Sequence, residues 1–138
     1  MAQTLILDAE ALNALAHPRE RGALALRARS ILEVSRERRA MVRVPAPVLV
    51  EVCRDSRRDA AIAHLLGARG IGVVPADRAI SQAAGHLLAR HGLSSAHAVD
   101  ALLVATAFLL APSAIATGDP KDIRLLTSSL RGVQVIAL

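Results

Sequence analysis

Four acidic residues of this chain lie within or directly after apolar stretches, where a charged side chain is costly. They are Asp8, Glu51, Asp100 and Asp119. A buried carboxylate without a partner costs several kcal/mol unless it is paired or bound to a cation. The chain has a single lysine, and none of the four acids has an arginine directly beside it in the sequence. The pattern indicates one shared, partly buried pocket that holds a divalent metal, and hence a metal-dependent enzyme.

Composition and charge narrow the functional classes. The chain has 138 residues, 53% of them hydrophobic, which suits one domain over residues 1–138 with a single core. Phe108 is the only aromatic residue, which argues against RNA binders that stack bases on aromatic rings. Of the 17 basic residues only Lys121 is a lysine, and the formal net charge is +5. The arginine bias fits contact with RNA phosphates, and it fits equally a GC-rich coding sequence.

The sequence predicts a cytoplasmic protein without a membrane segment. Cys53 is the only cysteine, which excludes an intrachain disulfide and a cysteine-based zinc site. No basic region followed by a long apolar core is visible near residue 1. The uncharged stretch over residues 101–118 is interrupted at Pro112 and Ser113, which favours a buried helix followed by a buried strand.

The elements that must position the four acids alternate along the chain. Apolar runs predict strands over residues 4–7, 41–44, 71–74, 114–117 and 133–137. Helices are predicted over residues 9–16, 19–39, 45–53, 55–66, 78–90, 96–110 and 120–130. This order predicts a three-layer α/β/α sandwich with a mainly parallel sheet of about five strands.

The predicted elements bring the acids to one edge of that sheet. Asp8 and Asp119 each follow the carboxyl end of an apolar strand. Ligand sites of open parallel sheets form at this edge. Glu51 and Asp100 lie on predicted helices that can lean over the same edge, so we expect the four acids to converge there.

The chain resembles the PIN domains of the VapC toxin type over essentially its whole length. The segments that carry the resemblance are residues 5–9 with Asp8, residues 44–52 with Glu51, residues 97–105 with Asp100, and residues 116–126 with Thr117, Asp119 and Asp122. The last segment is the most specific of them. Two positions depart from the family pattern: Glu10 stands where the family often has a small or hydroxyl residue, and Ala9 offers no hydroxyl beside Asp8.

The resemblance implies a ribonuclease that uses Mg²⁺ or Mn²⁺, is held inactive by a cognate antitoxin, and commonly forms a homodimer. In this hypothesis Asp8, Asp100 and Asp119 bind the metal directly or through water. Glu51 binds the metal or orients the attacking water, and Thr117 donates a hydrogen bond to a carboxylate or to the RNA phosphate. Asp122 either joins the metal site or only favours the dipole of the following helix.

Each acid also has a purely structural interpretation. Asp8 and Asp119 can cap the helices that follow them. Glu51 can be a residue of a helix surface, Asp100 can pair with His97, and Glu10 can be a solvated helix residue. These interpretations do not exclude metal binding, because a capping carboxylate can also be a ligand.

Two other functions remain open on the sequence. A phosphatase of the haloacid-dehalogenase kind also begins with a strand that ends in an aspartate, and Glu10 would be its second acid. It needs a lysine as well, and Lys121 is the only one. A non-catalytic module with an arginine-rich surface for RNA or protein is the other alternative. This non-catalytic function does not explain why four acids lie within or beside apolar stretches.

Overall fold

A parallel β-sheet forms the centre of the molecule. The computed structural model describes residues 2–68 and 70–138, and this part of the chain contains a sheet of five strands. The strands are β1 (Thr4–Leu7), β2 (Met41–Pro45), β3 (Gly72–Val74), β4 (Ser113–Thr117) and β5 (Val133–Ala137). They lie in the order β3-β2-β1-β4-β5, and every neighbouring pair is parallel.

The strand order reverses at β1, the central strand. Leu5 of β1 is in register with Val42 of β2 on one side and with Ala114 of β4 on the other. The chain therefore builds outward from β1 through β2 to β3 and then returns to place β4 on the opposite side of β1. Such a reversal leaves a crevice beyond the carboxyl ends of the two strands concerned.

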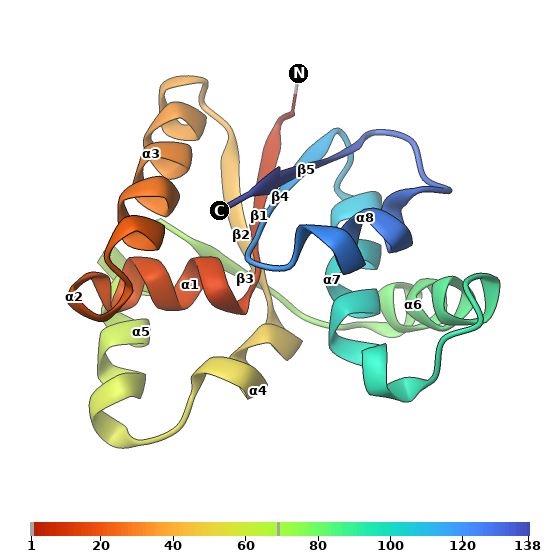
Figure 1. Ribbon diagram of the computed structural model, residues 1–138, viewed down its shortest axis with the longest axis horizontal. Helices are drawn as coiled ribbons and strands as arrows, with labels where there is room; N and C mark the ends of the chain where they lie inside the picture. The colour runs from red at the N-terminus through yellow and green to blue at the C-terminus, as the bar shows by residue number, and fades with distance from the viewer. Residues whose placement is uncertain (1, 69) are drawn as a thin grey trace.

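Helices cover the two faces of the sheet and give three layers (Figure 1). The described helices are α1 (Ala9–Ala16), α2 (Pro18–Arg21), α3 (Ala23–Glu37), α4 (Leu49–Val52), α5 (Ser56–Ala68), α6 (Arg78–Arg90), α7 (Ala98–Leu109) and α8 (Pro120–Thr127), with short 3-10 helices η1 (Ala46–Val48) and η2 (Ser95–His97). In Figure 1, α1, α2, α3 and α5 lie on one side of the sheet and α6, α7 and α8 on the other.

The core lies between the sheet and these helices. All four residues of β1 and all five of β4 are buried. A central parallel strand is covered on both faces, which explains why both segments are almost continuously apolar. On the α7 side, Leu103 and Val104 join the buried cluster. The two central strands are thus rigidly held, and so are the residues that follow them.

The fold class predicted from the sequence is confirmed, and the sheet is parallel throughout. One helix was predicted wrongly. The stretch from residue 19 to 39 is divided into α2 and α3 at Gly22, whose φ of +50° lies in the left-handed region that glycine tolerates. Amphipathic periodicity does not register such a break, because apolar positions continue on both sides of it.

Several boundaries also differ from the prediction. The predicted helix over residues 45–53 is a 3-10 turn followed by the single turn α4, which ends at Val52 because Cys53 has extended backbone. The last helix ends at Thr127 and not near residue 130. Strand β3 begins at Gly72, one residue later than predicted. None of these differences moves an acid away from the carboxyl edge.

Within the described residues, no helix combines the length and the apolar character needed to cross a membrane.

Candidate metal centre

Four of the five predicted metal-site acids line one hollow at the carboxyl edge of the sheet, whereas Asp122 is not among its lining residues. The hollow has a volume of about 330 Å³ and lies where β1, α4, α7 and the end of β4 meet. Its acidic lining residues are Asp8, Glu10, Glu51, Asp100 and Asp119. Four separate segments of the chain contribute these side chains, and the crevice between β1 and β4 is the place where they meet.

Asp8 connects the two central strands at the floor of this hollow. It is the N-cap of α1, and its Oδ1 accepts a hydrogen bond from the Ala11 amide at 2.8 Å. Its Oδ2 accepts one from the Gly118 amide at 3.0 Å, directly after β4. Burial raises the pKa of Asp8 above its ordinary value, although hydrogen bonds from Thr117, Ala11 and Gly118 partly offset this. The capping role and a ligand role are therefore compatible in one side chain.

Thr117 holds the loop that carries Asp119. Its side chain is fully buried, its hydroxyl oxygen accepts the Asp119 amide at 2.9 Å, and its hydroxyl is hydrogen-bonded to Asp8. The structure thus places Thr117 against a carboxylate, and its burial keeps it from an incoming phosphate. Asp119 occupies the N-cap position of α8, but within the described residues its side chain makes no capping hydrogen bond. Its carboxylate remains available to a ligand.

Asp100 faces the other acids from the first turn of α7. Burial, followed by the negative charges of Glu51, Asp119 and Asp122, raises the pKa of Asp100 above its ordinary value of 3.8. Each of these three acids is thus near enough to Asp100 for its negative charge to oppose ionisation of Asp100. A cation among them would remove the repulsion.

A second grouping shares Asp100. Single ligand atoms of His97, Asp100 and Asp122 all lie within 4.8 Å of one another, the one such trio in the described part of the chain. Asp8, Glu51 and Asp119 surround the hollow at wider spacing. Sequence reasoning left His97 outside the predicted site. The signal that could have included it is its position three residues before Asp100, since residues three apart share a helix face.

Glu10 is held at the rim by two neighbours. Its Oε1 pairs with Nη1 of Arg21 at 3.2 Å. Its side chain lies over Gly118, where an added Cβ would stand 2.4 Å from the Glu10 Cγ. The glycine is therefore required for close packing and not for an unusual backbone angle. Glu10 is partly exposed, which agrees with its interpretation as a solvated helix residue, and it also lines the hollow and is ion-paired.

Burial of the acids differs from what the apolar flanks suggested. Asp8 and Asp100 are partly buried, whereas Glu51 and Asp119 are exposed. Glu51 lies on the one-turn helix α4, where Val52 is buried in the core and Val50 is 72% exposed. An apolar run on a helix does not bury every position, since helix faces alternate with a period near 3.6. Glu51 therefore reaches the hollow from its rim.

The chemistry of this donor set fits a hard divalent cation. The acidic lining offers only carboxylate oxygens, which Mg²⁺ and Mn²⁺ prefer, and wide spacing suits a metal that keeps some of its waters. The trio with His97 adds a nitrogen donor, which Mn²⁺ accepts more readily than Mg²⁺. The neighbouring acids contribute to the raised pKa of Asp100, and a bound cation would offset their negative charge.

The doubly wound sheet with an acidic crevice at its reversal point defines a single-domain α/β protein with a PIN-like fold. No protein-family model and no curated protein sequence matches the chain. Among solved structures it is similar to a chain in the crystal structure of VapBC2 from Rickettsia felis bound to a DNA fragment from their promoter. The TM-score is 0.67 at 10% sequence identity, and the match covers 98% of each chain. At this identity the likeness establishes the fold.

Proposed function

We propose that this chain is a metal-dependent endoribonuclease that hydrolyses RNA phosphodiester bonds. The observation that carries the proposal is the convergence of Asp8, Glu51, Asp100 and Asp119 on one hollow at the sheet reversal. The acids come from four separate segments of the chain and differ in burial, yet their side chains line the same hollow. Clustered acids with raised pKa values cost stability in the absence of a cation, so their arrangement favours a metal-binding function.

In the proposed site each residue has its own role. Asp8 and Asp100, the more buried pair, would hold the cation. Asp119 is a further ligand, and Glu51 at the exposed rim binds the metal or orients the attacking water. Thr117 positions Asp8 and the Asp119 loop. When bound, Mg²⁺ or Mn²⁺ supplies an activated water and offsets negative charge on the phosphate and on the leaving oxygen.

We further propose that the enzyme is the toxin of a type II toxin–antitoxin system, with a cognate antitoxin protein as its partner and a homodimer as its assembly. The support is the whole-length resemblance to VapC-type PIN domains together with the structural similarity to a chain of the VapBC2 crystal structure. The net charge of +5 suits an RNA substrate. The phosphatase alternative loses support, because Glu10 is paired with Arg21.

The test incubates the purified protein with total RNA and with a tRNA pool in Mg²⁺, Mn²⁺ or EDTA. Asp100→Asn is the informative variant, because the described residues give the Asp100 carboxylate no hydrogen bond whose loss would disturb the fold. Glu33→Gln, an exposed change of the same kind on α3, is the matched control. We expect discrete cleavage that requires metal, persists in Glu33→Gln and disappears in Asp100→Asn.

Two outcomes would contradict the proposal. Cleavage that continues in EDTA or in Asp100→Asn would exclude the acidic hollow as the catalytic site. Absence of cleavage together with no measurable Mn²⁺ binding by calorimetry would exclude the metal centre itself. Metal binding without cleavage would restrict the search to narrower RNA substrates.

A further inference from the structure

One face of the sheet is incompletely covered by helices. On the side that carries α3, α1 packs on β4 and α3 packs on β2, whereas the helix that packs closely on β5 is α8, which lies on the other side (Figure 1). Parallel sheets are normally covered on both faces. The α3 side of the edge strand β5 therefore presents sheet surface where a helical layer would be expected, whereas β4 beside it is buried.

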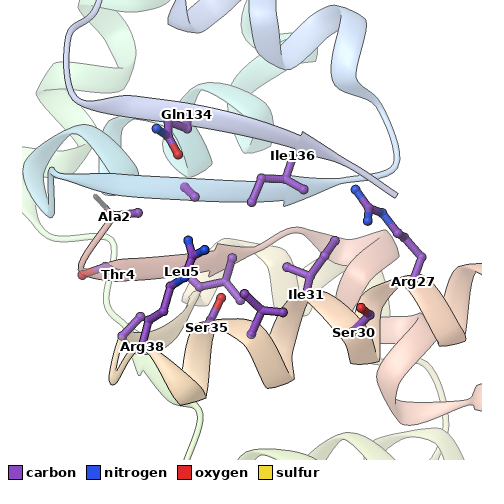
Figure 2. A pocket seen from close by; sticks show the side chains of 13 residues that line it. Ala2, Thr4, Leu5, Arg27, Ser30, Ile31, Ser35, Arg38, Gln134 and Ile136 are labelled. Atoms are coloured by element: carbon purple, nitrogen blue, oxygen red, sulfur yellow. The ribbon is translucent and has the colours of Figure 1, made fainter.

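A groove of about 410 Å³ occupies this position. One wall is α3, which contributes Ile31 and Val34, and the floor is formed by strands β1, β4 and β5 (Figure 2). Ile136 and Gln134 of β5 face it, with Ile136 half-buried and Gln134 exposed. Val34 is 42% exposed in the absence of a partner. The groove thus has an apolar centre that contacts water.

Arginines mark the two ends of the groove. Arg27 and Arg38 both line it from α3, near opposite ends in Figure 2. They are eleven residues apart on and just after one helix, which corresponds to about 16 Å along its axis. Arg27 donates from Nε to the Ala137 carbonyl at 3.3 Å, and no ion pair of either arginine occurs within the described residues. No acidic residue is among the described residues that line the groove.

We propose that this groove binds an amphipathic helix of about three turns from a partner protein, with acidic residues toward both of its ends. Its apolar side would cover Val34 and Ile136, and its carboxylates would meet Arg27 and Arg38. Charge complementarity favours this occupant over a second copy, because the same face of another copy would bring arginine against arginine. The groove begins at Thr4 and Leu5, whereas Asp8 follows the other end of β1. The proposal therefore stands independently of the nuclease site.

The test uses two acetylated and amidated peptides of about 18 residues, long enough to form a helix. Both carry leucine along one face; one has glutamate and the other lysine near each end. Binding is followed by the backbone amide shifts of Ala114, Gln134 and Ile136 in the folded protein. We expect the acidic peptide to bind at least about tenfold more tightly than the basic one. In the Arg27→Glu/Arg38→Glu variant the order should reverse.

The matched control is Arg29→Glu/Arg131→Glu, which makes the same charge change at exposed positions outside the groove. It should keep the wild-type preference, and thermal unfolding checks that both variants fold. Acidic-peptide binding that is absent, or unchanged when Arg27 and Arg38 are reversed, would overturn the proposal. Concentration-dependent shifts at the same amides without any peptide would assign the groove to a second copy, and that too would overturn it.

Discussion

The carboxylate of Asp8 accepts the Gly118 amide at 3.0 Å and so joins the end of β1 to the loop after β4. Its other oxygen accepts the amide of Ala11 at 2.8 Å. A residue proposed as a metal ligand is therefore also a structural connection between the two central strands. The four acids of the site should consequently respond differently to the same substitution.

Asp8→Asn should destabilise the protein even without metal. The two carboxylate oxygens of Asp8 accept the backbone N–H groups of Ala11 and Gly118, whereas an asparagine side chain has only one acceptor oxygen. In the variant, one of these two N–H groups would face the NH₂ group and lose its acceptor. We expect a loss of about 1–2 kcal/mol in the free energy of unfolding, measured by urea denaturation in EDTA. Asp119→Asn is the comparison, because the described residues give the Asp119 side chain no capping bond. Equal losses in the two variants would contradict the dual role of Asp8.

Asp100→Asn should have the opposite effect on the metal-free protein. The pKa of Asp100 is raised in the folded state, so ionisation of this group opposes folding. Its contribution to stability is fully present below the ordinary pKa of 3.8 and is lost as pH rises through the folded-state value. The asparagine variant should thus be more stable than the wild type at pH 7, by an amount that solvent screening keeps small.

The pH dependence of this difference is the decisive measurement. Thermal unfolding in EDTA should give a stabilised Asp100→Asn at neutral pH and no difference below pH 3.8, where the wild-type carboxyl is also neutral. Glu33→Gln should change the stability very little at either pH, since Glu33 is exposed on α3. A stability difference that is independent of pH would mean that packing and not charge separates Asp100→Asn from the wild type.

Metal should reverse this order of stability. Binding to the folded state alone stabilises by about 2.7 kcal/mol at a metal concentration one hundred times the Kd. We expect Mn²⁺ to raise the Tm of the wild type and of Glu33→Gln, and to leave that of Asp100→Asn almost unchanged. If Asp100→Asn gained the same stabilisation, the cation would be bound elsewhere on the chain.

Gly118→Ala should be destabilising because the added Cβ would clash with both the Cβ and the Cγ of Glu10. The added Cβ would lie 2.4 Å from the Glu10 Cγ, so Glu10 must move or the loop must shift. We expect a loss of about 1–3 kcal/mol. Glu10→Ala removes the Cγ but keeps the Cβ, which would still stand 2.7 Å from the added Cβ, so adding it to Gly118→Ala should recover only part of the loss in a double-mutant cycle. Additive losses would place the cost in the backbone of the loop.

The sequence was sufficient to predict how the acids are brought together, because carboxyl ends of parallel strands share an edge wherever the sheet lies. Asp8 and Asp119 followed from that rule alone. The exposure of Glu51 could not be predicted, since it depends on which face of the single turn α4 meets the core. The pairing of Glu10 with Arg21 depends on the break at Gly22, which apolar periodicity does not reveal. The groove beside α3 depends on which part of the sheet the helices leave uncovered, and no local sequence pattern predicts this.

The return of the chain from β3 to β4 has a consequence for synthesis on the ribosome. β1 is made well before its second neighbour β4 and the loop with Asp119, because β2, β3 and the helices between them come first in the sequence. A nascent chain that stops before β4 has Asp8 but neither the Gly118 amide that holds it nor the crevice that collects the acids. The proposed hydrolytic centre thus comes into existence only after β4 and the Asp119 loop have been made, so a nascent chain that lacks them would not attack the RNAs that surround it.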